Sequence, residues 1–177
     1  HIIRPGITED DVQELARSLV ETLIVWGAVG LAATQVGRSI RMIACHELTP
    51  EGKLSNPPAG HVLLDPHLLW RDGTQKFPEG CLSLPGLTLD VERAARVRVA
   101  AMAPNRNKIV VECTGLAAQV LQHEMDHLNG KLLTDYMSPY ERGRVRMRLE
   151  QAKAKGLRLV PTSAQVRATA EFRGQFR

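Results

Sequence analysis

The 177-residue sequence has few aromatic residues, 4% of the total, and only three cysteines. Cys45, Cys81 and Cys113 are too few, and odd in number, for a disulfide framework, so we expect a reducing compartment and at least one free thiol. Long apolar runs are also missing, because the stretch from Leu19 to Leu31 is interrupted by a glutamate, a threonine and two glycines. A membrane span needs roughly 20 apolar residues. We therefore expect a soluble protein without a membrane segment.

Charge is distributed unevenly along the chain. The net charge is +4, but residues 138–177 contain 10 Lys and Arg against 3 Asp and Glu, which gives them a net charge of +7 and leaves −3 on the residues before them. Beyond Gly156 the sequence is basic and weakly patterned, and we expect it to be extended or partly disordered. Repeats and low-complexity tracts are absent from the sequence. Length and composition predict one domain over residues 1–177.

Hydrophobic periodicity predicts three helices and several strands. The helices are expected over residues 8–26, 116–128 and 138–155, and the strands over residues 40–45, 62–64, 97–102 and 109–112, the last two as a hairpin. The Gly- and Ala-rich residues 27–37 and the proline-containing residues 53–60 are predicted to be loops. This mixture indicates an α+β fold, with antiparallel or mixed sheets packed around a central helix and a further helix towards the C-terminus.

Residues 123–127 read His-Glu-Met-Asp-His and match the pattern HExxH, inside the helix predicted over residues 116–128. The i, i+4 spacing places His123 and His127 on one face of that helix, where both can reach one metal ion. Glu124 is offset around the helix and suits a general base that acts on water. The alternative is a surface helix with two chance histidines, since so short a pattern recurs by accident.

A catalytic metal site of this type needs three protein ligands and one open position. The longer pattern HExxHxxGxxH would need a histidine at position 133, where Leu133 cannot bind a metal ion. Glu150 is another downstream candidate, but it belongs to the strongly basic third helix. We favour Cys81, which follows a glycine and precedes strand-forming residues, because its thiolate can approach from a strand facing the helix. Cys45 and Cys113 are expected to be inert thiols.

The Gly- and Ala-rich residues 27–37 form the third segment of interest. Small side chains let a backbone approach a ligand closely, and the amide of Gln35 donates a hydrogen bond without titrating, as stabilisation of an oxyanion requires. The alternative is a turn after the first helix in which Gln35 faces solvent. The segment lacks the strand-to-helix setting of a dinucleotide-binding fingerprint.

Taken together, the three segments resemble the peptide deformylase family, whose motifs GxGxAAxQ, EGCxS and HExDH occur in this order. The matching residues are Ala28 to Gln35, Glu79 to Ser83 and His123 to His127. Ala28 stands where the family has its first motif glycine, which removes no catalytic group. The family also has a segment ahead of the first helix that is mostly missing from this sequence and contains no motif residue.

The resemblance implies a metal site and a reaction. Cys81, His123 and His127 would bind one divalent ion, with Fe²⁺ as the natural metal and Zn²⁺, Ni²⁺ or Co²⁺ as substitutes, because one sulfur and two nitrogens suit all of these ions. The reaction would be removal of the N-formyl group from formylmethionine at the start of new polypeptides. Glu124 would activate the water that attacks the formyl carbon, while Gln35 and the backbone N–H of Leu82 would stabilise the oxyanion.

The resemblance also implies supporting residues and a substrate pocket. Glu79 and Arg93 would form a buried pair that holds the Cys81 strand. Positions three, four and seven before His123 share its helix face, and an unbranched methionine would fit an apolar pocket built partly from them. The residues expected to line the pocket are Val29, Gly30, Phe77, Leu116, Gln119 and Val120, among which Gln119 is unusual because the family has an aliphatic residue there.

Partners and location are expectations of the same kind. The resemblance implies formylmethionyl nascent peptides as substrates, a bacterial-type cytoplasmic location or an organelle, and contact of the basic C-terminal helix with ribosomal RNA. A solvated basic face is the alternative for that helix. A metallopeptidase that cuts internal peptide bonds and a metal-binding module without catalysis are the alternatives for the whole chain. The intact set of Glu124, Gln35 and Cys81 favours the deformylase.

Overall fold

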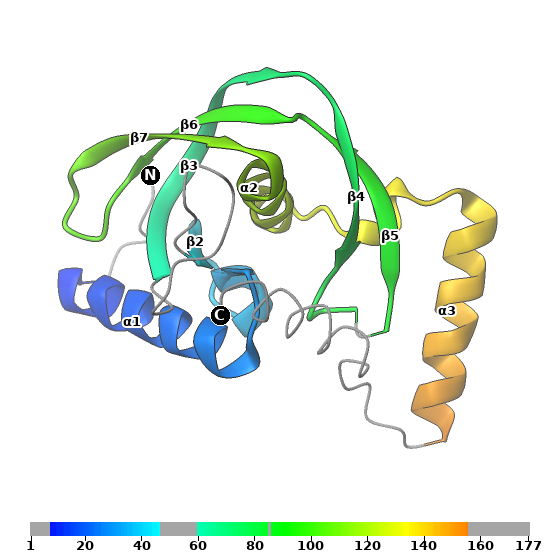
Figure 1. The fold of residues 1–177 in the computed structure, drawn as a ribbon. Helices are drawn as coiled ribbons and strands as arrows, with labels where there is room; N and C mark the ends of the chain where they lie inside the picture. Colours follow the sequence, from blue (N-terminus) through cyan, green and yellow to red (C-terminus); the bar gives the residue numbers. More distant parts are fainter. Residues whose placement is uncertain (1–7, 47–59, 85, 156–177) are drawn as a thin grey trace, which may run out of the picture.

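The computed structural model describes residues 8–46, 60–84 and 86–155 (Figure 1). The elements in chain order are α1 (Glu9–Trp26), β1 (Gly30–Ala32), the 3₁₀ helix η1 (Ala33–Val36), β2 (Met42–His46), β3 (Gly60–Asp72), β4 (Gln75–Gly80), β5 (Thr88–Arg93), β6 (Arg96–Met102), β7 (Lys108–Thr114), α2 (Gly115–Leu128), the 3₁₀ helix η2 (Leu133–Tyr136) and α3 (Pro139–Ala154). Residues 53–59 of one predicted loop and the tail beyond Gly156 lie outside the described residues.

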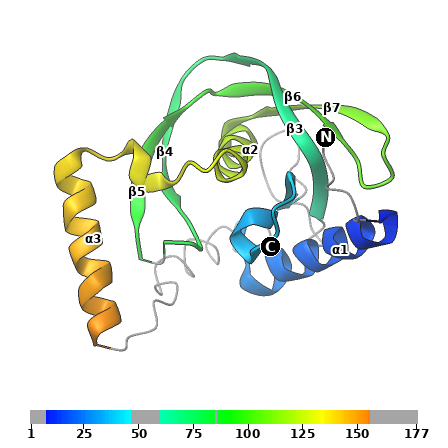
Figure 2. The ribbon, with the colours of Figure 1, turned by 180° about the vertical axis from the view of Figure 1, so that it is seen from behind.

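The strands form two antiparallel sheets. Five strands pair in the order β1-β2-β3-β6-β7, and β4 pairs with β5 in a separate two-stranded sheet. In Figure 1 the two sheets arch around α2, which is seen end-on in the middle of the molecule, and α1 lies across the open side of the larger sheet. Figure 2 gives the same view from behind and shows α3 at the far end of the molecule from α1. The predicted α+β class is therefore confirmed, and all pairings among the described strands are antiparallel.

Local sequence signals explain where α1 begins and ends. Thr8 caps the helix by accepting a hydrogen bond from the backbone N–H of Asp11, whose carboxylate accepts in return from Thr8 N. Gly27 ends the helix in the left-handed conformation, with φ of 62°. The side chains buried against β2 and β3 recur at helical spacing and include Val12, Leu15, Leu19 and Leu23. The prediction for this helix is confirmed.

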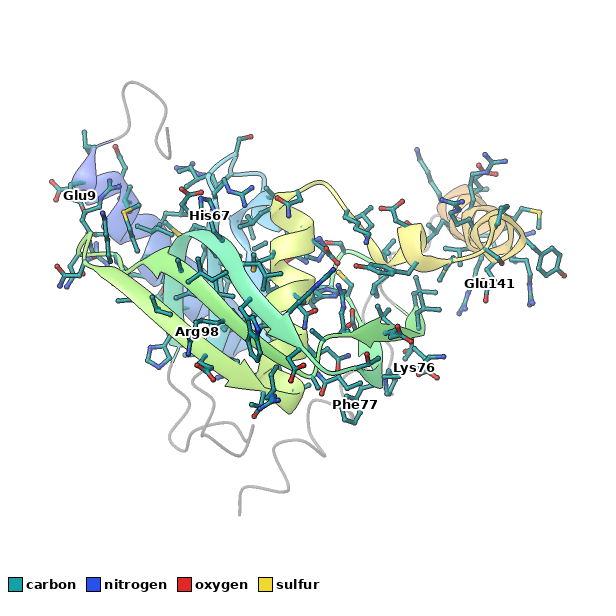
Figure 3. All side chains as sticks on the ribbon, turned by 90° about the horizontal axis from the view of Figure 1, so that it is seen from above. Glu9, His67, Lys76, Phe77, Arg98 and Glu141 are labelled. Carbon is teal, nitrogen blue, oxygen red and sulfur yellow. The ribbon has the colours of Figure 1, made fainter. Side chains whose placement is uncertain are left out.

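The predicted limits of α2 and α3 also agree with the structure. α2 ends just before Gly130, which has φ of 73°, and it buries residues on more than one side because sheets lie around it. Ser138 and Glu141 form a capping box at the start of α3, and Pro139 occupies the first turn, where its missing N–H leaves no bond unmade. None of the residues of α3 whose burial is described, all but Ala152, is buried, and the helix stands apart from the body. Its side chains point in all directions (Figure 3).

Residues 27–37, predicted to be a loop, contain a strand and a 3₁₀ helix. β1 pairs with β2 from Gly30 opposite Cys45 to Ala32 opposite Ile43, and η1 follows directly. The loop prediction was wrong because glycine and alanine have little strand preference of their own. Hydrogen bonds to β2, which is distant in sequence, supply the stabilisation.

The strands beside Cys81 are a second difference between prediction and structure. β4 and β5 had no clear signal, and β3 extends well beyond the predicted residues 62–64, to Gly60–Asp72. Pro78 lies within β4, and a proline normally argues against a strand because it cannot donate to a neighbour. It is tolerated here because β4 pairs with β5 alone among the described strands. Gly60, predicted to be in a loop, is the first residue of β3.

Two hydrophobic clusters lie on the two sides of the larger sheet's inner strands. One packs α1 against β2 and β3, and the other packs α2 against β2, β6 and β7. The second cluster includes Val97, Val99, Ala118 and Leu121, and it fixes α2 beneath the sheet. Within residues 8–46, 60–84 and 86–155, no helix is long and apolar enough to cross a membrane.

Candidate metal centre and active site

The folded chain brings Cys81 to the two histidines of α2. The Sγ atom of Cys81 lies 3.2 Å from Nε2 of His127, and Nε2 of His127 lies 3.2 Å from Nε2 of His123. Cys81 directly follows β4, so the two-stranded sheet delivers the thiol, while the helix repeat places the imidazoles one turn apart. All three ligand atoms lie within 4.8 Å of one another, which is close enough to hold one metal ion. This is the convergence that the sequence predicts for Cys81.

Glu79 fixes the orientation of the first histidine. Its Oε2 atom lies 2.8 Å from Nδ1 of His123, which leaves the Nε2 atom of that ring facing the ligand cluster. Arg93 donates two hydrogen bonds to the Glu79 carboxylate, from Nε at 2.8 Å and from Nη2 at 2.9 Å. Burial acts to raise the pKa of Glu79, but these bonds lower it below its ordinary value. The predicted Glu79–Arg93 pair is confirmed.

Two further residues, which the sequence did not predict as site residues, join this network. Arg93 Nη1 also donates to Asp126 Oδ2 at 2.5 Å and to the Tyr136 hydroxyl at 2.8 Å, and that hydroxyl donates to Asp126 at 2.7 Å. The sequence contains a signal that could have identified Asp126, since this residue stands between the two histidines in the HExDH motif. No sequence signal identifies Tyr136, because only the fold brings η2 against β5. The network ties α2, β5 and η2 together behind the ligands.

The thiol of Cys81 has the properties of a metal ligand. Burial acts to raise its pKa, but hydrogen bonds with His123 and His127 outweigh burial and lower the pKa to about 5. A thiolate, the form that binds metal ions, is therefore favoured at neutral pH. One sulfur and two imidazole nitrogens suit Fe²⁺, Zn²⁺, Ni²⁺ or Co²⁺ and leave a coordination position for water. The residues present therefore fit a catalytic metal ion.

The other metal-ligand candidates do not reach this cluster. Glu150 lies on the exposed surface of α3, where its carboxylate is 3.7 Å from Nε of Arg146. Leu133 is buried with Val91 beside Cys81 and offers no donor atom. Burial raises the pKa of Cys45, as expected for an inert thiol, and it also raises that of Cys113, which is only partly buried.

Gln35 projects its amide towards the ligand cluster. The backbone N–H of Ala32 donates to Oε1 of Gln35 at 2.8 Å, so the NH₂ end faces the opposite way. That end lies 3.6 Å from Cys81 Sγ and donates to Ser83 Oγ at 3.1 Å. Leu82 lies between Cys81 and Ser83 in the turn after β4. Its backbone N–H has no acceptor within the described ranges. Gln35 and Leu82 thus offer N–H donors beside the candidate metal ligands.

Glu124 is buried beside the ligands and keeps one oxygen free. It is 3% exposed, and its Oε2 atom has no hydrogen-bond partner within the part of the chain that the structure describes. Burial raises the pKa of Glu124 to about 7, with smaller opposing effects from His123 and His127. A carboxyl group with a pKa near 7 can both accept and return a proton at neutral pH, as a general acid–base catalyst must.

Gly30 is required for the position of Glu124. A Cβ atom at Gly30 would lie 2.5 Å from Oε1 and 2.7 Å from Cγ of Glu124, and 2.8 Å from Cγ1 of Val120. Gly30→Ala is expected to lower the free energy of unfolding by about 1–3 kcal/mol through overpacking. It should also lower kcat by up to about 100-fold, because the Glu124 carboxylate must move. Urea denaturation and steady-state kinetics measure the two effects.

The control for this substitution is Gly143→Ala on α3, where an added Cβ meets no atom within 4 Å. Alanine is the better helix former, so this variant should be at least as stable as the parent and equally active. Equal stability and activity of Gly30→Ala and Gly143→Ala would contradict the close approach at Gly30.

The residues expected to line a substrate pocket lie on three elements around α2. Leu116, Gln119 and Val120 are on α2, Val29 and Gly30 are in or next to β1, and Phe77 is on β4. Val120 is buried, while Leu116 and Val29 are partly buried against the same cluster, so all three also contribute to the core. Phe77 is 47% exposed, and Figure 3 shows its ring at the outer edge of β4.

The chain is similar in sequence and in fold to known peptide deformylases. Residues 3–143 match the family model described as polypeptide deformylase. The peptide deformylase of Alkalilimnicola ehrlichii is 42% identical over 148 residues, covering 84% of this chain and 80% of that protein. A peptide deformylase structure from Legionella pneumophila superposes with a TM-score of 0.73 at 34% identity, covering 88% of this chain and 89% of that one. A Met-Ala-Ser-bound deformylase structure from Acinetobacter baumannii gives a TM-score of 0.67 at 28% identity, with 76% and 87% covered.

The family model spans most of the chain, and it includes Gln35, Cys81, Glu124 and both histidines. The chain therefore belongs to the polypeptide deformylase family, metal-dependent hydrolases that remove the N-formyl group from formylmethionyl peptides.

Proposed function

We propose that the chain performs this deformylation at the site formed by Cys81, His123 and His127, with Glu124 as the general acid–base group. The observation that supports the proposal most strongly is the convergence of one cysteine and two histidines beside a buried carboxylate with a free oxygen. When bound, a divalent ion supplies a Lewis acid that polarises the formyl carbonyl and lowers the pKa of a water molecule.

In this mechanism the residues of the chain move one proton and stabilise one oxygen. Glu124 Oε2 takes a proton from water as the water oxygen bonds to the formyl carbon. Gln35 Nε2 and the Leu82 N–H donate to the formyl oxygen, where negative charge develops. Glu124 then returns the proton to the leaving nitrogen as the C–N bond breaks, which releases formate and a free amino terminus.

We propose Fe²⁺ as the natural metal, on the resemblance to the family. Zn²⁺, Ni²⁺ and Co²⁺ are expected to bind the same three residues, because each accepts sulfur and imidazole ligands. Val29, Gly30, Phe77, Leu116, Gln119 and Val120 are proposed to receive the methionine side chain. Its unbranched and polarizable shape suits a pocket with apolar walls. We further propose a single domain over residues 1–177 and a cytoplasmic, bacterial-type location, where protein synthesis begins with formylmethionine.

Formate release tests the function directly. Protein purified anaerobically with Fe²⁺, or reconstituted with Ni²⁺, should release one formate per formyl-Met-Ala-Ser consumed and leave the internal peptide bonds intact. Acetyl-Met-Ala-Ser is the matched control, since it presents the same side chains with a bulkier acyl group. Cleavage between residues of the peptide would indicate a metallopeptidase. Metal binding without any release of formate would indicate a non-catalytic module.

We propose that the basic helix α3 contacts ribosomal RNA. Its exposed arginines include Arg142, Arg144, Arg146 and Arg148, and the helix stands apart from the body (Figure 3). Removal of residues 138–177 is expected to abolish salt-sensitive binding to ribosomes, because neutralised phosphates release counterions and make affinity fall steeply with salt. Sedimentation of ribosomes with the protein at increasing salt concentration measures this.

A variant with those four arginines changed to glutamine keeps the helix and the chain length, so it separates charge from structure. It should lose most of the salt dependence, and both variants should still deformylate short peptides, since the proposed catalytic residues lie outside α3. Ribosome binding that neither change affects would leave α3 as a solvated basic surface.

A further inference from the structure

Gln119 is a buried polar side chain on the helix that holds the metal ligands. It is 3% exposed, although most glutamines lie at the surface, and it is one turn before His123 on the same face of α2. Its Nε2 atom donates to the backbone oxygen of Phe77 at 3.3 Å. This bond links α2 to β4 and fixes which end of the amide is nitrogen, because oxygen in that place would face the Phe77 oxygen.

The rest of the Gln119 amide is unused. Its Oε1 atom is buried without a hydrogen-bond partner in the described part of the chain, and no second acceptor meets Nε2 there. A buried acceptor without a partner is destabilising, so native proteins seldom keep one without a reason. Glu124 Oε2 is a comparable free oxygen on α2, and the reaction explains it. Gln119 takes no part in the reaction, so its free oxygen points to a ligand.

The place of Gln119 identifies the part of the ligand that would meet it. β1 contacts α2 on one side through Gly30, which lies against Val120 and Glu124, and β4 contacts it on the other through the Gln119–Phe77 bond. On the proposed function, the first side chain of the formyl peptide enters between these strands, beside the metal ligands. Methionine leaves Gln119 unsatisfied there, because a thioether has no hydrogen to donate.

We propose that Gln119 adapts this pocket to a first side chain that ends in a primary carboxamide, so that the enzyme accepts formyl-glutaminyl peptides as well as formylmethionyl peptides. The free groups of Gln119 are one acceptor and one N–H, and a carboxamide presents the same two groups. The two amides can therefore pair by two reciprocal hydrogen bonds. Glutamine is unbranched and close to methionine in length, so it reaches as deeply.

The test compares two substrates in three enzymes, the parent and two variants at Gln119. The ratio of kcat/KM for formyl-Gln-Ala-Ser to that for formyl-Met-Ala-Ser is expected to fall by about tenfold in Gln119→Leu, the effect of losing one or two neutral hydrogen bonds. Gln119→Met is the matched control for shape, because it keeps an unbranched side chain and removes both polar groups. It should change the ratio in the same direction. Metal content, measured for each variant, shows whether loss of the bond to Phe77 has disturbed Cys81.

A binding measurement on the unaltered metal-loaded enzyme does not depend on the variants. By calorimetry, Gln-Ala-Ser should bind within about tenfold of Met-Ala-Ser, whereas a wholly apolar pocket would disfavour the buried amide by about 100-fold or more. A kcat/KM ratio that is the same in all three enzymes, or a 100-fold weaker binding of Gln-Ala-Ser, would overturn the inference and leave deformylation intact. Failure of the proposed function would give a different result, because formyl-Met-Ala-Ser itself would then not be hydrolysed.

Discussion

Glu124→Ala is expected to keep its metal ion and its fold but to lower kcat by a factor of about 100 or more, the usual effect of losing a general acid–base group. The reason lies in the geometry, since the free Oε2 atom of Glu124 is buried beside the ligands and has no structural partner among the described residues. Metal analysis, circular dichroism and the rate of formate release measure the three properties on one preparation.

Glu112→Ala is a suitable control for this variant. Glu112 is an exposed carboxylate on β7 that pairs with Arg98, and its removal should leave the rate unchanged. Loss of the metal ion from Glu124→Ala would mean that Glu124 is a ligand. A rate close to that of Glu112→Ala would mean that the proton passes through another group.

Cys81→Ser is expected to weaken metal affinity by more than the roughly 10- to 100-fold that is typical of residues that only support a ligand. A hydroxyl does not ionise at neutral pH, whereas the hydrogen bonds from His123 and His127 lower the pKa of the Cys81 thiol to about 5. Competition with a chelator of known affinity gives the dissociation constant. Catalysis at limiting metal should fall in parallel.

Cys113→Ser provides the comparison, because Cys113 is partly buried on β7 and lies outside the ligand cluster. It should keep the metal affinity of the parent chain. If Cys81→Ser also retained full metal content and activity, the three-ligand assignment would be wrong and another donor would have to be sought near His123.

The sequence by itself determined the features that depend on neighbouring residues. The first residues of α1 and α3 follow from the pairs Thr8 with Asp11 and Ser138 with Glu141. The sequence can show such N-terminal caps because each is a contact between residues three apart. The helix repeat alone places His123 one turn before His127. The motifs around these residues were enough to indicate the family, and comparison with known proteins confirmed it.

Only the tertiary structure decided which distant segments meet. β1 is a strand because it pairs with β2, β4 tolerates Pro78 because β5 alone pairs with it among the described strands, and Tyr136 reaches Arg93 because η2 packs on β5. Burial was equally hidden, since the exposure of a side chain depends on what the fold places around it. In the sequence, Gln119 is a polar residue with no indication of burial. Only the packing of α2 against β4 shows that its side-chain oxygen is buried without a hydrogen-bond partner among the described residues.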